Sequence, residues 1–532
     1  MFGFHRRTRS LISVKDLCKY EKLDIQQEAE GSIMIFEVQD EEENTTPPQQ
    51  RQLTLIYILF LAEAIMAASL SSQISLLAAD SSEMGVCSSL SASYLRSILS
   101  CAYFFGSTYG LFWGWLSDRV GRKPVALFGL WGMSLCCVSM GFATSLSGCV
   151  VLRFVAGCIG SAVSTSGMAM LGDVSKGTGQ KTRNAARLPL VAVCGSVGPL
   201  LQSMVAKLGE GRLEGVWQRW PALSGQIACG SLVLFLAAME AICIRETLPT
   251  ASTASATIDH DDSEKGALLA YSSEDTSGVL SISVTETDST DDLSTPAPIG
   301  ITQLLRAPSL IALLVSFSLL SLHTSTLSLL LPHLGQTSTR HGGMGLPCTW
   351  LSPVLLAFKA IAAGAIFYWT PVLAAKTDVL RLYRRISLTF PLLYILIPIS
   401  ALLLPATALI NGLAVFSKDL LAASSDVLIL LLALSAAPAA NSSGTVLGLV
   451  ALANLFRALA VGVAGLAYYL SAEYELGVVD TALWALLAGT ATAGAAVAWW
   501  VRDSPRVGVD FDENCLTWKE VFDVEGGFEA EG

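Results

Sequence analysis

The sequence GWLSDRVGRKP, residues 114–124, brings Asp118, Arg119, Arg122 and Lys123 together within six positions, directly after a long apolar run. Charges packed this closely form either a working site or a device that serves a site elsewhere. The setting decides between the two, because charged groups in water undergo no desolvation that would turn them into sharp acids or bases.

The chain around this cluster is too apolar for a water-soluble fold. Of its 532 residues 52% are hydrophobic and only 14% are charged, and the mean hydropathy is +0.56. Soluble domains usually carry about 25% charged residues. The composition therefore indicates a membrane protein, and the net charge of −11 comes mostly from polar segments that stay in water.

Twelve apolar segments are long enough to cross a bilayer, since a spanning helix needs about 20 residues. They form two groups of six, which predicts an all-α membrane protein built from two six-helix bundles. The first group is expected at 53–79, 93–115, 125–144, 148–171, 187–207 and 222–244. The second group is expected at 309–332, 353–375, 386–408, 420–440, 445–470 and 479–501.

Three polar segments lie outside these spans. Residues 245–308 are acidic and rich in Ser and Thr, and they have too few apolar side chains to offset their ordering entropy. We expect a disordered linker there, between bundles at 53–244 and 309–501. The tails at 1–52 and 502–532 have the same character.

The basic residues of the short loops predict the orientation. Lys and Arg gather in loops 2-3, 4-5 and 8-9, whereas loops 1-2, 3-4 and 11-12 have none. Because cytosolic loops carry the excess of Lys and Arg, we expect both termini and the linker in the cytosol. The plasma membrane and the vacuolar membrane both stay open as locations.

The helix before the charge cluster carries Gly106, Gly110 and Gly114 at a repeat of four, a pattern that lets another helix approach closely. The loop that follows resembles, position for position, the loop 2-3 signature of the major facilitator superfamily. The matching residues are Gly114, Leu116, Asp118, Arg119, Gly121, Arg122 and Lys123. Six plus six spans around a long middle loop are similar to that superfamily as well.

Other phrases resemble one branch of the superfamily. Arg153 in RFVAGCIG looks like its helix 4 motif, and Gly195, Gly198 and Pro199 look like the helix 5 motif of antiporters, with Leu201 and Gln202 where a glycine pair is expected. NAARLPL, WQRWPALSGQ and RETLP look like fungal drug:proton antiporters similar to zinc-induced facilitator-like and tetracycline-resistance-like carriers. The second half resembles this branch more loosely.

The resemblance implies a role for the charge cluster. The acid at Asp118 would cap the start of helix 11 near Gly444 and Thr445, where unsatisfied N–H groups favour an anion. The guanidinium of Arg122 would pair with Asp173 at the end of helix 4. We expect both contacts only while the cytosolic side is closed. The predicted gate therefore comprises Gly114, Asp118, Arg119, Gly121, Arg122, Lys123 and Asp173, with its charges in cytosolic water.

Charges inside the bilayer cost at least about 2.5 kcal/mol each, so every one is a candidate for function. Glu63 lies about ten residues into helix 1, or roughly 15 Å. It is predicted either to exchange a proton or cationic substrate, or to fix helix packing. Arg457 in helix 11 either pairs with an acid or anionic substrate, or binds carbonyls of a broken helix. The family resemblance implies proton coupling for Arg153, and snorkelling to the outer interface is the alternative.

Two uncharged candidates complete the set. Gln202 on helix 5 is predicted to line the cavity in place of the missing glycine. His323 on helix 7 either titrates near neutral pH or is a hydrogen-bonded packing residue. Glu240 in helix 6 and Lys359 in helix 8 are expected to reach the membrane interface.

These features predict a secondary transporter that moves a small organic solute, drug or metal chelate by alternating access, with proton antiport as the favoured coupling. A uniporter of the same fold and a non-transporting sensor or scaffold are the alternatives. The sequence has no GxxxxGK[ST] loop and no HExxH motif, and its cysteines lack metal-ligand spacing. We therefore expect no enzyme activity, cofactor, metal or nucleic acid, and a monomer whose partners are substrate, protons and lipid.

Overall fold

The computed structural model describes residues 47–83, 89–143, 145–175, 177–209, 223–248, 301–305, 307–336, 346–403, 407–437, 442–473 and 478–501. The chain divides into two compact units, Met1–Gln50 and Arg51–Gly532. Of the first unit only residues 47–50 are described, as the first turn of a helix.

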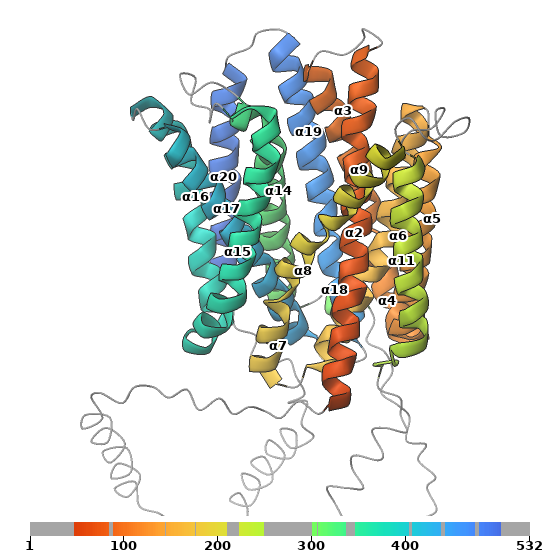
Figure 1. Cartoon of the computed structure of the whole chain (residues 1–532). Coiled ribbons are helices and arrows are strands. Elements are labelled where there is room, and N and C mark those ends of the chain that lie inside the picture. Colours follow the sequence, from red (N-terminus) through yellow and green to blue (C-terminus); the bar gives the residue numbers. More distant parts are fainter. Residues whose placement is uncertain are drawn as a thin grey trace, which may run out of the picture. The chain divides into compact units, whose positions relative to one another are not determined.

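The regular elements in the described ranges are all helices, so the predicted fold class is confirmed (Figure 1). The N-terminal half contains α2 (Pro47–Glu83), α3 (Ser89–Ser107), α4 (Gly110–Val120), α5 (Arg122–Gly141), α6 (Leu146–Val174), α7 (Gly177–Ala185), α8 (Leu188–Cys194), α9 (Val197–Gly209) and α11 (Leu223–Cys243). The C-terminal half contains α13 (Ile301–Leu304), α14 (Pro308–Gln336), α15 (Cys348–Lys376), α16 (Val379–Leu403), α17 (Thr407–Ala436), α18 (Ser443–Ala451), α19 (Ala453–Glu473) and α20 (Val478–Trp500).

Within the described residues, 11 helical stretches are long and apolar enough to cross a membrane. The remaining predicted span, 93–115, is divided into α3 and α4 by a turn at Thr108–Tyr109. The fifth span is broken in the same way between α7, α8 and α9, and the eleventh at Leu452. These breaks fall where helices approach one another closely.

The tenth span begins earlier than the sequence suggests. It was expected at 420–440, but α17 covers Thr407–Ala436. The part of α17 that precedes the predicted span contains two charged residues, Lys418 and Asp419. In the structure the Lys418 ammonium lies 3.1 Å from the Asp419 carboxylate and 2.7 Å from the Ser328 hydroxyl, so the two charges are paired inside the protein.

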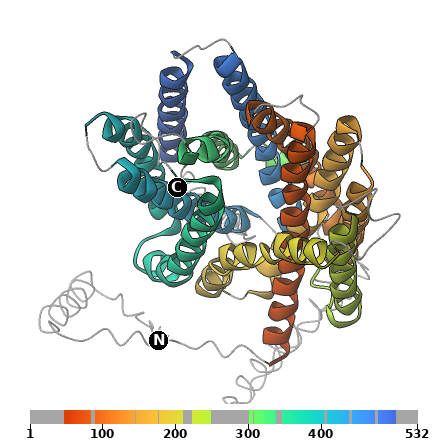
Figure 2. The same ribbon diagram turned by 45° about the horizontal axis from the view of Figure 1, so that its top comes forward.

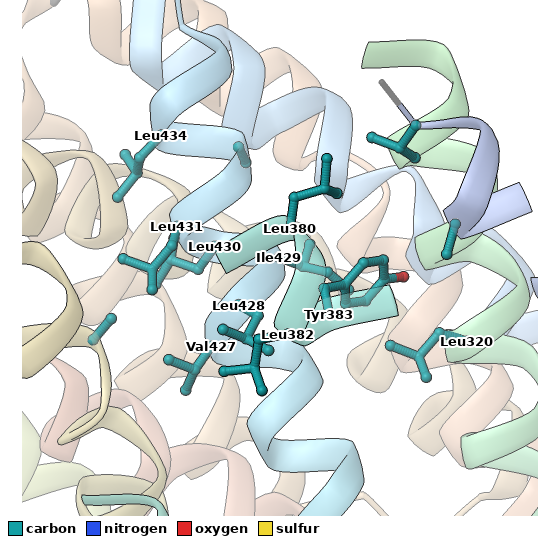
Figure 3. Packing of buried hydrophobic residues seen from close by; sticks show 14 of the residues in the cluster. Leu320, Leu380, Leu382, Tyr383, Val427, Leu428, Ile429, Leu430, Leu431 and Leu434 are labelled. Carbon is teal, nitrogen blue, oxygen red and sulfur yellow. The ribbon is translucent and has the colours of Figure 1, made fainter. Parts of the chain in front are cut away.

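Two large hydrophobic cores hold the described helices together, and a small third cluster is formed by Leu393, Ile397 and Ala414. One large core consists mainly of side chains between Leu53 and Ile244, and the other mainly of side chains between Leu304 and Val501. In the second core, leucines of α17 pack with Tyr383 of α16 and Leu320 of α14 (Figure 3). In Figure 1 the helices α14 to α17 and α20 lie on one side and α2 to α6, α9 and α11 on the other, with α19 beside α3 and α18 beside α4 between them; Figure 2 shows the same helices from another direction.

The glycine ridge of the second span serves two neighbours, because the helix is broken in its middle. A Cβ at Gly106 would meet the backbone of α6 at Phe154. A Cβ at Gly114 would instead overlap with the carbonyl oxygen of Gly444 in α18. The ridge therefore joins α3 to a helix of its own half and α4 to a helix of the other half.

Candidate functional site

Asp118 lies in the last turn of α4 and caps α18. Its Oδ1 accepts a hydrogen bond from the backbone N–H of Gly444 at 3.0 Å, and its Oδ2 accepts from the N–H and the hydroxyl of Thr445 at 2.6 and 2.7 Å. The residue at the α18 N-cap, Ser442, makes no side-chain cap of its own. Asp118 thus supplies the anion that this helix start favours.

Asp118 and Arg122 were expected in cytosolic water, and the structure corrects that expectation, whereas Arg119 is exposed. Asp118 is 7% exposed and Arg122 is fully buried. Burial raises the pKa of the Asp118 carboxyl above its ordinary value, although the hydrogen bonds from Thr445 act in the opposite direction. Sequence reasoning missed this because a loop residue is ordinarily exposed, whereas here α18 covers the loop.

Arg122 is the centre of the buried cluster. Its Nη1 donates to the carbonyl oxygen of Ala169 at 2.9 Å, and its Nη2 donates to the hydroxyl of Ser443 at 2.7 Å. The guanidinium also forms ion pairs with Asp173 and with Asp118. One side chain therefore connects α6, α18 and the end of α4.

Gly121 turns the chain between α4 and α5. Its φ of +118° lies in a region that side chains disfavour, so glycine is needed here. The helix that follows is capped by Glu246, whose carboxylate accepts from the N–H groups of Arg122 at 2.9 Å and Lys123 at 3.0 Å. Glu246 belongs to the RETLP phrase. The sequence did not predict this contact, because Glu246 lies far along the chain from Arg122 and Lys123.

A second polar group lies within the N-terminal half. The Glu63 carboxylate on α2 faces the Ser164 side chain on α6, whose hydroxyl donates to the carbonyl oxygens of Gly160 and Ser161. Tyr103 of α3 lies near enough to Glu63 and Arg153 to interact electrostatically with both. The Arg153 guanidinium carbon lies 4.9 Å from the centre of the Tyr103 ring. Glu63, Ser164, Tyr103 and Arg153 form the set that we call the N-half polar chain.

Arg153 does not reach the membrane interface, in contrast to one of the two interpretations above. It is 3% exposed, and its Nε donates to the carbonyl oxygen of Leu99 at 3.4 Å. Among the described residues its Nη1 has no hydrogen-bond partner. The side chain therefore turns inward toward Tyr103. There its Nη1 can donate a hydrogen bond to a further group.

The C-terminal half carries paired charges. Arg457 of α19 lies 3.6 Å from the Asp426 carboxylate of α17, and its guanidinium carbon is 5.6 Å from the Phe317 ring centre. The Asp426 side chain is 52% exposed although it lies ten residues before the end of α17. Of the two interpretations of Arg457, this placement matches pairing with an acid. The sequence showed Asp426 only as an interruption of a helix.

The helix 5 motif packs against the helix that carries Glu63. A Cβ at Gly195 would meet Ala64, and a Cβ at Gly198 would meet Ser69 and the backbone of Ile65. The half-buried Pro199 follows in α9. These glycines let α8 and α9 approach α2 beside Glu63.

The two cavity candidates are packed inside their own halves. Gln202 is 8% exposed, and its Nε2 donates to the carbonyl oxygen of Ser69 at 3.4 Å. His323 is 2% exposed, and its Nδ1 lies 2.8 Å from the Tyr394 hydroxyl. The cavity-lining position expected for Gln202 stays a prediction. For His323 the geometry matches the packing interpretation.

Glu240 also departs from expectation. It was expected at the membrane interface, but it is fully buried in α11. Neither carboxylate oxygen has a hydrogen-bond partner within the described part of the chain. A buried carboxylate without partners is costly to keep charged, so Glu240 is a further charged-residue position inside the protein that the sequence did not single out as buried.

Comparison with known proteins assigns the family. A sequence model of the Major Facilitator Superfamily matches residues 56–472, and the chain therefore belongs to that family. It is a multi-pass membrane transporter for a small-molecule substrate, and the family consists of transporters and not of enzymes.

Individual relatives are distant. The chain is 25% identical over 475 residues to the major facilitator superfamily multidrug transporter mfsB of Aspergillus fumigatus, covering 78% of this chain and 77% of that protein. It is 41% identical over 66 residues to the multidrug resistance protein MdtG of Erwinia billingiae, covering 12% and 16%. The crystal structure of the human organic anion transporter MFSD10 (TETRAN) matches with a TM-score of 0.59 and 18% identity over 85% of this chain and 100% of that one.

Proposed function

We propose that this transporter exports or sequesters a small organic solute, drug or metal chelate in exchange for protons. The observation that carries the proposal is the N-half polar chain, in which a carboxylate at mid-span lies near a tyrosine and an inward-facing arginine. Relatives described as multidrug transporters support the substrate class.

The physical basis of the coupling is the cost of a bare charge in hydrocarbon. Ionised Glu63 costs at least about 2.5 kcal/mol at the bilayer centre unless a proton or a cationic substrate neutralises it. The transporter would then change from one access state to the other only while a proton or a cationic substrate neutralises Glu63. Proton and substrate would therefore move in opposite directions. Arg153 and Tyr103 would stabilise the ionised Glu63 carboxylate after one of them has left and before the other has bound.

Alternating access would be controlled at the end where α4 joins α5. The contacts of Asp118 and Arg122 with α18 hold the two halves together at this end. We place this end, both termini and the linker in the cytosol, because loops 2-3, 4-5 and 8-9 carry the basic residues. The described conformation is then closed to the cytosol, and release of these contacts would open it.

Proton flux in reconstituted vesicles tests the proposal. Cationic drugs and metal chelates are added to vesicles that enclose a pH-sensitive dye, and the drug-driven pH change is compared between wild type and Glu63→Gln. We expect at least about a tenfold loss of coupled flux in the variant, equivalent to about 1.4 kcal/mol. Asp378→Asn, which removes an exposed acid outside the spans, is the matched control and should behave as wild type.

Two outcomes would contradict antiport. Substrate movement down its own gradient without any proton movement would identify a uniporter. No flux of any compound in the panel, together with an unchanged Glu63→Gln variant, would favour a protein that does not transport at all.

A further inference from the structure

A pocket of about 530 Å³ lies where two helices are broken at the same level. Tyr109, Phe112 and Trp115 line it from the α4 side, Leu452 lines it at the break between α18 and α19, and Ile301 of α13 completes the wall. This volume falls in the range of small-molecule sites, and its lining is almost entirely apolar. We call it the α4 pocket.

The α4 pocket opens at the depth of lipid acyl chains. Tyr109 lies eleven residues before Val120 at the end of α4, or about 16 Å along the helix. Half of a bilayer's hydrocarbon core is about 15 Å thick. Tyr109 is 52% exposed and Phe112 48% exposed, so the protein leaves this face of α4 uncovered. The natural occupant of an uncovered apolar pocket at this depth is an acyl chain.

A positive charge stands at the interfacial end of the same helix face. The Arg119 guanidinium carbon lies 4.0 Å from the ring centre of Trp115, and the arginine is exposed. Among the described residues, the ion pairs of the gate use Arg122 and not Arg119. Arg119 is therefore exposed beside the pocket residue Trp115 near the end of α4, within reach of lipid head groups, where a phosphate suits a guanidinium well.

We propose that the α4 pocket binds an anionic glycerophospholipid of the adjacent leaflet, with one acyl chain between Phe112 and Leu452 and its head group at Arg119. The pocket walls come from both halves of the transporter, so they come together only while α4 packs on α18. A bound lipid therefore favours the conformation in which Asp118 caps α18, because a ligand stabilises the state that it binds. The orientation proposed above decides only that this leaflet is the cytosolic one.

Lipid retention tests the proposal directly. The purified full chain is equilibrated with equal amounts of palmitoyl-oleoyl phosphatidylglycerol and phosphatidylcholine, and the lipids that remain bound are counted by native mass spectrometry. We expect wild type to retain phosphatidylglycerol about fivefold more than phosphatidylcholine, as expected for one basic residue near the head group. Arg119→Gln should abolish this preference. Arg381→Gln, which removes another exposed arginine far from the pocket lining, should keep it.

A pocket-filling variant tests the position of the acyl chain. Leu452→Phe should lower the retention of both lipids. Because Arg119 is exposed, Arg119→Gln keeps the fold, and the proposal stays testable even where Leu452→Phe does not fold. An unchanged preference in Arg119→Gln, equal retention of both lipids by wild type, or full retention in a folded Leu452→Phe variant would each overturn the proposal. No substrate or proton gradient is used, so this outcome is independent of the antiport test.

Discussion

Two loops occupy equivalent places in the two halves: the first joins α4 to α5, and the second joins α15 to α16. The residues around them form hydrogen bonds with different parts of the protein. In the first loop, Asp118 and Arg122 make hydrogen bonds with Gly444, Thr445 and Ser443 of the other half. Beside the second loop, Arg384 in the second turn of α16 donates to Ala498 at 3.2 Å and to Val501, both within its own half.

We infer from this difference that the two halves, although similar in fold, contribute unequally to closure of the transporter. The first loop has Gly114 before it and Gly121 within it, which permit close approach and a sharp turn. The second loop reads AAKTDVLRLYRR and has no glycine at all. We infer that the first loop controls access and that the second mainly stabilises its own half.

The largest effect should come from the close contact between α4 and α18 beside the first loop, which we call the α4–α18 seam. Gly114→Ala would drive a methyl group into the carbonyl of Gly444, and a backbone carbonyl has no rotamer by which to move away. Overpacking costs about 1–3 kcal/mol, so the closed population should fall about 5- to 150-fold. Backbone hydrogen exchange at Gly444 and Thr445 should rise accordingly.

Gly364→Ala is the matched control, because a Cβ on this glycine of α15 meets no atom within 4 Å. Its exchange at the α18 start should equal that of wild type. Equal exchange in both variants would mean that the seam does not close the transporter.

An intermediate effect is expected from the cap. Asp118→Asn keeps the shape of the side chain but removes the charge that satisfies the start of α18. Loss of a helix cap costs about 0.5–2 kcal/mol, so hydrogen exchange at Gly444 and Thr445 should rise about tenfold. Turnover should fall, while the substrate affinity of the open state stays nearly constant. Asp378→Asn in the second loop should change neither quantity. A large loss of equilibrium substrate binding without a change in exchange would show that Asp118 belongs to the substrate site.

The smallest effect should come from the second loop. Arg384→Gln removes hydrogen bonds to Ala498 and Val501, which lie in the same half. We expect a decrease of about 2–4 °C in the melting temperature, with unchanged exchange at the α18 start. Faster exchange there would show that this loop also contributes to closure.

Much of the fold could be predicted because hydrophobic length and loop charge are local properties. The sequence showed the membrane spans and, through the family resemblance, named Asp173 as a neighbour of Arg122 and Gly444 and Thr445 as neighbours of Asp118. The structure places these residues together. The orientation and the roles of these residues stay predictions.

What could not be predicted depends on contacts between distant segments. Lys418 and Asp419 lie in the part of α17 that precedes the predicted span 420–440, and inside the protein they are paired with each other. Glu240 looked interfacial from its place near a helix end, but neighbouring helices cover it completely. A single sequence shows how far along a helix a charge lies, and it does not show which side of that helix is covered.

The contact between Gly114 and Gly444 has a consequence for the range of cargo. Because backbone meets backbone there, α4 stops at a distance that no side-chain rearrangement can alter. The amplitude of closure is then the same whatever molecule is enclosed. A transporter with such a fixed end point can accept cargo of different sizes only if the accommodation takes place deeper in the membrane, around Glu63 and Asp426, and not at the gate.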